Sequence, residues 1–163
     1  MATIALFNSS NIISLIIGFF LGRKISHCAI GFNYKGVPSF LHSTWPSVKI
    51  SPRDDFLKED NLVAEFEILP ELDDEVVLAE KRVGEPYDAP GLIGYIFVLL
   101  FRKFGIKLHN PLASKSASVC SEFIIQLDVN NEIPEFYRLD PATVTPRDLF
   151  DICSNGKSFK KIS

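Results

Sequence analysis

The chain has 163 residues, of which 47% are apolar, 23% charged and 12% aromatic. This length suits one domain over residues 1–163 that encloses its own core, and the composition excludes a disordered or low-complexity chain. The formal net charge of −3 provides no long-range attraction for phosphate backbones. No nucleic-acid partner is therefore expected.

The first half of the chain is rich in β-prone runs. A short strand is expected over Thr3–Phe7, followed by a polar turn or helix cap at residues 8–10 and an apolar helix over Asn11–Gly22. Cys28–Phe32 and Pro38–Ser43 predict two antiparallel strands joined by a hairpin turn at Asn33–Gly36. Next come a strand over Val48–Ile50, one or two helical turns within Pro52–Lys58, and a strand with period-two alternation over Leu62–Leu69.

Helical patterns dominate the second half. A charged amphipathic helix is expected over Asp73–Val83, ending at Gly84, and an apolar helix over Gly91–Phe104. A loop over His109–Ser116 leads into a short helix over Val119–Leu127. Pro146 and Asp148 are typical of a helix opening, and Phe159–Ile162 predicts a last strand. Because strands cluster early and helices late, the predicted fold class is α+β.

The two apolar segments, Asn11–Gly22 and Gly91–Phe104, are shorter than the roughly 20 apolar residues that span a bilayer. No basic region precedes the first, as one would in a secretory signal, and Arg102 and Lys103 interrupt the second. Both predict buried helices. The alternative is contact with a membrane surface or a partner, because the second segment is apolar nearly all round. A cytoplasmic or virion-associated protein is expected.

Three cysteines, Cys28, Cys120 and Cys153, cannot all pair within one chain. Their spacing indicates neither a disulfide framework nor a zinc site, and the sequence contains no Walker loop, HExxH or GxGxxG motif. Free thiols in a reduced compartment, with no metal and no cofactor, are the simplest expectation.

His27 and His42 belong to the two strands of the expected hairpin. Residues on one face of neighbouring strands have Cβ atoms about 5 Å apart, so the two imidazoles can be neighbours. A histidine oriented by a second polar side chain is the base half of a nucleophilic triad. The alternative is a pair of strand histidines whose polar groups are satisfied by backbone or water.

Cys120 is the candidate nucleophile, because it stands where a helix begins. Unpaired N–H groups at a helix N-terminus favour a thiolate and can also hold an oxyanion. A nearby imidazolium lowers the pKa of the thiol further. Against this, a free cysteine is often only a small buried hydrophobe, and Cys28 and Cys153 fit that description better. In a regular strand Cys28 faces away from the His27 side chain.

The remaining candidates have ordinary structural explanations. His109 lies in a loop, where a solvated surface position is expected. Tyr87 and Asp88 can line a cleft, but they also suit the loop before a helix. Glu122 in the first turn of a helix favours the helix dipole rather than acid catalysis.

Several segments, in this order, resemble the circularly permuted NlpC/P60 group of papain-like cysteine hydrolases. TIALF, the following apolar helix and SHCAIGF resemble the family's first strand, helix and histidine-bearing strand. GEPYD resembles its tyrosine-bearing segment, SVCSEFIIQL its nucleophile helix and TPRDLFDI its closing segment. In the permuted group the histidine precedes the cysteine, as His27 precedes Cys120 here. The resemblance covers most of the chain and implies a papain-like fold, with an antiparallel sheet packed against helices and the nucleophile at a helix N-terminus.

By this resemblance Cys120 is the nucleophile, His27 the general base and His42 the polar residue that orients the imidazole. Tyr87 is implied to lie beside the thiol and to help bind the substrate carbonyl. The implied reaction is hydrolysis of an amide bond, such as that of a cell-wall peptide, through a thioester on Cys120. The expected partner is then a peptide or acyl substrate.

Two other functions stay open. A lipid acyltransferase or esterase of the same architecture is favoured by the two apolar helices. A non-catalytic structural or virion-associated module is compatible with the 14 phenylalanines of the chain.

Overall fold

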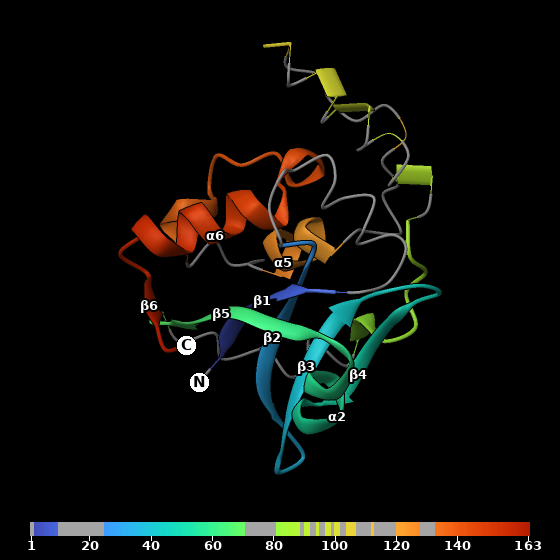
Figure 1. Cartoon of the computed structure of the whole chain (residues 1–163), viewed down its shortest axis with the longest axis vertical. Coiled ribbons are helices and arrows are strands. Elements are labelled where there is room, and N and C mark those ends of the chain that lie inside the picture. The colour runs from blue at the N-terminus through green and yellow to red at the C-terminus, as the bar shows by residue number, and fades with distance from the viewer. Residues whose placement is uncertain are drawn as a thin grey trace.

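The structure is a computed structural model that describes residues 2–9, 25–70, 81–88, 120–127 and 133–163, together with residues 90, 91, 94, 97, 98, 100, 101, 104–106 and 112. Six strands form one antiparallel sheet in the order β4-β3-β2-β1-β5-β6 (Figure 1). They are β1 (Thr3–Asn8), β2 (His27–Tyr34), β3 (Val37–Ser43), β4 (Val48–Pro52), β5 (Asn61–Ile68) and β6 (Phe159–Lys161).

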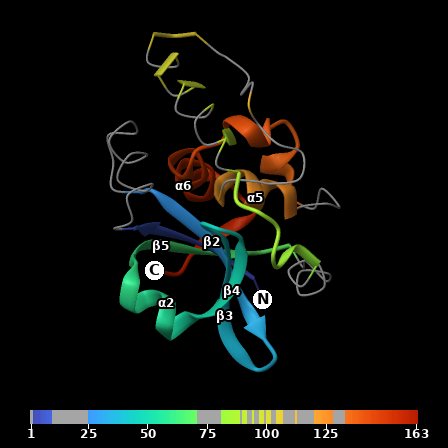
Figure 2. The ribbon, with the colours of Figure 1, turned by 90° about the vertical axis from the view of Figure 1, so that its right-hand side faces the viewer.

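Within the described part of the chain, three α-helices pack on this sheet. α2 (Arg53–Glu59) covers one face, whereas α5 (Cys120–Leu127) and α6 (Pro146–Asn155) lie on the other (Figure 1, Figure 2). Two short 3₁₀ helices, η1 (Pro134–Phe136) and η2 (Pro141–Thr143), lie between α5 and α6 in the chain. The predicted α+β class is therefore confirmed.

Successive strand residues point to opposite faces, so the buried apolar residues of the described strands divide into two clusters. On the α2 side the cluster consists of Ala5, Phe7, Ala29, Phe40 and Phe56. The larger cluster includes Cys28 of β2, Cys120 and Phe123 of α5, and Leu149 and Cys153 of α6. The α5 helix is thus fixed against β2 by apolar burial, which is the dominant favourable term in folding.

The β2–β3 hairpin sets the positions of both strand histidines. Its turn consists of Lys35 and Gly36, with φ of 50° and 85°. Positive φ at both central residues is the geometry that matches the twist of two-residue hairpins. The predicted turn at Asn33–Gly36 is correct in place but too long, because Asn33 and Tyr34 still pair with β3.

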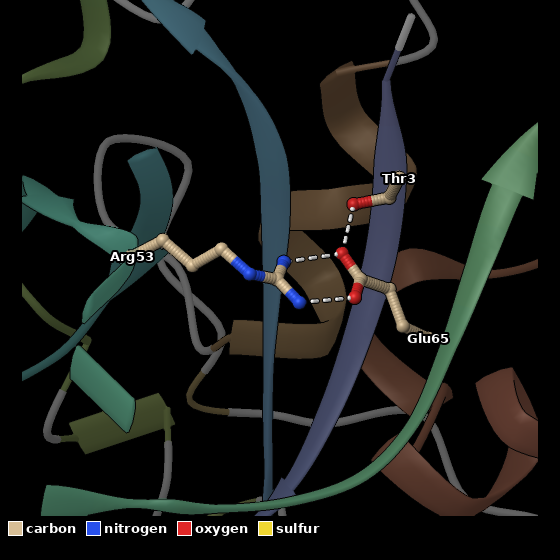
Figure 3. Close-up of polar contacts among 3 residues, drawn as sticks. All are labelled: Thr3, Arg53 and Glu65. Carbon is tan, nitrogen blue, oxygen red and sulfur yellow. Dashed lines mark hydrogen bonds and ion pairs between the residues drawn. The ribbon is translucent and has the colours of Figure 1, made fainter. Parts of the chain in front are cut away.

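A partly buried ion pair anchors α2 to the sheet (Figure 3). Arg53, the first residue of α2, donates to both carboxylate oxygens of Glu65 at 2.7 Å, and the Thr3 hydroxyl donates to one of them at 2.8 Å. A Cβ at Gly31 would collide with the Thr3 hydroxyl oxygen, so glycine is required beneath this network. The network fixes the start of α2 across β1 and β5.

The C-terminal helix begins as its sequence predicts. Thr145 accepts a hydrogen bond from the Asp148 N–H at 2.9 Å, and the Asp148 carboxylate accepts from the Thr145 N–H at 3.0 Å. With Pro146 in the first turn, this capping box fixes the start of α6. The helix then leads into β6, which pairs with β5 at the edge of the sheet.

The expectation of a buried apolar helix over Gly91–Phe104 is wrong for one of its sides. Gly91, Gly94 and Val98 are buried, but Phe97 and Phe104 are 52% and 74% exposed. Among the residues that the structure describes, no helix is both long and apolar enough to cross a lipid bilayer. The predicted helix over Asn11–Gly22, most of the one over Asp73–Val83 and the loop over His109–Ser116 apart from Leu112 lie outside the described residues.

Candidate active site

Cys120 is the first described residue of α5 and is 4% exposed. The next residue, Ser121, donates from its hydroxyl to the Val144 carbonyl at 2.6 Å. This bond fixes the first turn of α5 against the segment before α6. The position of the Cys120 sulfur is therefore set by packing on β2 and by this bond.

His27 is the first residue of β2 and pairs with Phe7 of β1. Its ring contacts the rings of Phe7, Phe56 and His42, with centroid separations of 6.4, 6.0 and 5.6 Å. It is also hydrogen-bonded to the Cys120 side chain. Because His27 stands at the end of its strand, its ring meets side chains from both faces of the sheet.

The Cys120 sulfur accepts hydrogen bonds from the Cys28 thiol, the His27 ring and the Cys28 backbone N–H. The bond from the Cys28 thiol is the largest influence on the pKa of Cys120, and burial opposes it by disfavouring the thiolate. The bond and charge of His27 act in the same direction as Cys28. The pKa of Cys120 is therefore held well below its ordinary value.

The other two cysteines behave as neutral thiols. Burial is the largest influence on the pKa of Cys28, which is raised well above its ordinary value, and the hydrogen bond to Cys120 adds to it. Burial likewise raises the pKa of Cys153. All three cysteines are free. Of the three cysteines, only Cys120 is stabilised in the thiolate form.

His27, by contrast with the neutral cysteines, is stabilised in its charged form. Burial alone lowers the pKa of a histidine, but the hydrogen bond and charge of Cys120, together with the charge of Asp60, outweigh burial and raise the pKa of His27. A thiolate and an imidazolium consequently stabilise each other across the contact between β2 and α5.

His42 lies beside His27, with the two rings nearly perpendicular at 87°. Its Nε2 is hydrogen-bonded to the Ser51 hydroxyl at 3.1 Å, and its Nδ1 has no hydrogen-bond partner among the described residues. Burial, followed by the charges of His27 and Lys49, lowers the pKa of His42 to about 3. His42 is therefore neutral next to a charged His27.

Tyr87 is buried, and the Pro46 carbonyl accepts a hydrogen bond from its backbone N–H at 3.0 Å. Burial raises the pKa of the Tyr87 phenol, and the charge of Cys120 raises it further, so the hydroxyl is a neutral donor close to the thiolate. Asp88 accepts from the Gly91 N–H at 2.8 Å and so caps the helical segment that follows.

Arg82 joins the Tyr87 segment to α5. Its guanidinium lies 4.4 Å from the centre of the Phe123 ring and donates to Gln126 at 3.0 Å. It also pairs with Glu85 at 2.8 Å. Gln126 in turn donates to Glu122 at 3.0 Å, so Glu122 has a structural role in α5.

A cavity of about 480 Å³ opens beside the two histidines on the α2 side of the sheet. His27, His42 and Phe56 belong to its walls, whereas Cys120 does not. Its rim carries Trp45, Lys49, Asp55, Glu59 and Asp60. The histidines thus face a polar cleft, and the sulfur lies behind His27.

The structure brings Cys120, His27, His42 and Tyr87 into one cluster. His109 lies outside the described residues. From the sequence, Cys28 is expected only to pack in the core, and its contact with the Cys120 sulfur is not predicted. The alternation of side chains along the strand could have predicted this contact, because Cys28 points to the face that α5 covers. No sequence pattern predicts that Asp60 and Phe56, both from the region of α2, lie near His27.

Among the residues that the structure describes, no three His, Cys, Asp or Glu side chains converge in a way that could hold a metal ion. No protein-family model and no curated protein matches the sequence.

One solved structure with a similar fold is the crystal structure of metalloprotein yiiX from Escherichia coli O157:H7, described as DUF1105. The two chains are 13% identical, the match covers 99% of this chain and 95% of that chain, and the TM-score is 0.55. At this identity the likeness extends to the fold alone.

Proposed function

We propose that the protein is a thiol hydrolase that cleaves an acyl bond through a thioester on Cys120. The observation that carries this proposal is the hydrogen-bonded pair of Cys120 and His27, in which the pKa of the thiol is lowered and that of the imidazole is raised. Matched shifts of this kind are typical of an activated nucleophile and its base.

In the proposed reaction the Cys120 thiolate attacks the substrate carbonyl carbon, and the carbonyl electrons move to the oxygen. Backbone N–H groups in the first turn of α5 stabilise this oxyanion. The tetrahedral intermediate collapses to a thioester, and His27 gives its proton to the departing amine or alkoxide. Neutral His27 then takes a proton from water as the water attacks the thioester, and Cys120 leaves as a thiolate.

His42 and Tyr87 have supporting roles in this scheme. His42 is neutral and packs against the His27 ring, which restricts the orientation of the base without competing for its charge. The Tyr87 hydroxyl keeps its proton and can donate a hydrogen bond to the substrate carbonyl. Both roles follow the order of motifs in the circularly permuted NlpC/P60 family, which we propose as the family of this chain.

An amide, such as that of a cell-wall peptide, is the first proposed substrate. A lipid acyl ester is the second, because exposed phenylalanines occur in the segment that precedes Cys120. The two are separated by measuring amine release from muropeptides against fatty-acid release from phospholipid vesicles. Whichever product depends on Cys120 identifies the substrate class.

Alkylation by iodoacetamide at pH 6 tests the mechanism without a known substrate. Peptide mapping by mass spectrometry should show Cys120 modified at least about tenfold faster than Cys28 or Cys153. His27→Ala should slow modification of Cys120, while Tyr34→Ala, which lies on the same strand away from the site, should not. Equal rates for the three cysteines, or no effect of His27→Ala, would refute the hydrolase and favour a non-catalytic module.

A further inference from the structure

The segment before the nucleophile has a charge unlike that of the rest of the chain. Residues 89–119 contain Arg102, Lys103, Lys107 and Lys115, which are four of the chain's 17 Lys and Arg, and none of its 20 Asp and Glu. The whole chain has a net charge of −3. A local excess of cations therefore stands out within an acidic protein.

The same segment exposes an apolar stripe. Gly91, Gly94, Phe97, Val98, Leu100 and Phe101 are all helical, and Phe104 begins the turn that ends the helix. Phe97, Leu100, Phe101 and Phe104 follow the spacing i, i+3, i+4, i+7, which places them on one helix face. All four are exposed. We call these four residues the outer stripe.

The side of the helix that adjoins this stripe packs on the protein. Gly91, Gly94 and Val98 are buried, and Val98 lines a cavity of about 620 Å³ together with Leu139 and Ile152. The apolar surface of the segment is therefore broader than the part that the protein covers. In Figure 1 its described residues lie at the end of the molecule farthest from the sheet, beyond α5 and α6, and Figure 2 shows the same arrangement.

We propose that the outer stripe docks onto an anionic lipid surface. Phenylalanine and leucine exposed on one face, in a segment whose sequence has four basic residues and no acidic ones, match the two properties of such a surface: an apolar layer beneath negative headgroups. The position of the segment at the end of the molecule lets it reach a flat surface without obstruction from the sheet. This proposal does not depend on the chemistry of Cys120.

Vesicle flotation tests the docking. The wild-type protein should float with vesicles that contain phosphatidylserine and only weakly with phosphatidylcholine alone. Phe101→Asp combined with Phe104→Asp should reduce binding by about tenfold or more. Tyr137→Asp is the matched control, because Tyr137 is an aromatic residue outside the segment and is 56% exposed.

A second variant separates charge from apolar contact. Replacing Arg102, Lys103 and Lys107 together by Gln should weaken binding to phosphatidylserine vesicles by about fivefold for each cation removed. It should leave the weak binding to phosphatidylcholine unchanged. Because this variant leaves the outer stripe intact, it remains informative even if the double Asp variant fails to fold.

The proposal is overturned if the wild-type protein does not bind phosphatidylserine vesicles, or if a folded double Asp variant binds them as the wild type does. It is also overturned if light scattering shows a wild-type dimer that Phe101→Asp dissociates, with no vesicle binding by either protein. The stripe would then be a contact between two copies of the chain. Lipid binding with no iodoacetamide selectivity at Cys120 would support docking and refute the hydrolase.

Discussion

At the scale of single residues, two of the hydrogen bonds that lower the pKa of Cys120 come from Cys28. Alanine is close to cysteine in size, but it has no thiol that could donate a hydrogen bond to the Cys120 thiolate. Cys28→Ala should therefore raise the pKa of Cys120 and move its alkylation profile to higher pH. The profile is obtained from iodoacetamide rates between pH 5 and about 9.

Cys153→Ala is the control for this change. Cys153 is buried in the same apolar cluster but is not among the groups that influence the pKa of Cys120. Its removal should leave the alkylation profile of Cys120 in place. An unchanged profile in Cys28→Ala would mean that His27 alone activates the sulfur.

Tyr87 provides a second prediction for a single side chain. If its hydroxyl binds the substrate carbonyl, Tyr87→Phe should lower kcat by about a hundredfold to a thousandfold, as expected for loss of one oxyanion donor. The alkylation rate of Cys120 should not change, because the thiolate displaces iodide at the methylene carbon of iodoacetamide and no oxyanion forms on its carbonyl. Tyr137→Phe, at an exposed position, should alter neither quantity, and equal kcat in both variants would remove Tyr87 from the site.

At the scale of elements, α2 is held by the pair of Arg53 and Glu65. Arg53 is 32% exposed and Glu65 only 4%. Glu65→Gln leaves a partly buried guanidinium without its counter-charge and should lower the free energy of unfolding by about 2 kcal/mol. Glu67→Gln is the control: its pair with Lys160 is longer, at 3.9 Å, and more exposed, so the loss should be below about 0.5 kcal/mol.

The pH dependence of this pair has a definite sign. Burial alone raises the pKa of Glu65, but the hydrogen bonds from Arg53 and Thr3 outweigh burial and lower it below the ordinary value of 4.5. The stabilisation is therefore complete above pH 4.5 and is lost as the pH falls through the lower folded-state pKa. The urea midpoints of the wild type and Glu65→Gln should converge in acid. A constant difference at all pH values would contradict this assignment.

The early strands illustrate what the sequence can predict. Apolar runs, period-two alternation and an Asn-Tyr-Lys-Gly turn are local signals, and they identify the β2–β3 hairpin and hence the contact of His27 with His42. The place of β6 beside β5 is not a local signal, because the two strands lie at distant positions in the chain. The role of α2 was missed for the same reason, because Phe56 contacts both histidines only once the chain has folded.

At the scale of the whole molecule, the pair of Cys120 and His27 joins the end of the sheet to a helix from the last third of the chain. Spacing alone offers no reason for that contact, and the expectation came from the order of motifs in a known family. The groups that can donate hydrogen bonds to the Cys120 sulfur depend on which face of β2 the α5 helix covers. The face that is covered is known only from the folded structure.

His42 and His27 have opposite effects on stability across the acid range. The unfolded chain protonates His42 near pH 6.5, whereas the folded protein resists until about pH 3, so the stabilisation by neutral His42 is lost as the pH falls from 6.5. The raised pKa of His27 gives stabilisation that is present below pH 6.5 and is lost at higher pH, as the pH rises through its folded-state pKa.

His42→Gln removes the first of these effects. The free energy of unfolding of the wild type should fall relative to that of the variant between pH 6.5 and 4, by at most about 1.4 kcal/mol per pH unit. Urea titrations at several pH values measure the difference. Parallel curves for the two proteins would show that His42 is readily protonated in the folded state.

The small exposed area of the Cys120 sulfur also limits which reagents can label it. We expect compact, uncharged electrophiles such as haloacetamides or small nitriles to reach the sulfur, and bulky maleimide dyes to be excluded. A covalent probe for this protein should therefore carry its reporter on a narrow spacer, with an alkyne for attachment after the reaction. Selectivity over surface thiols of other proteins would then come from size exclusion as well as from reactivity.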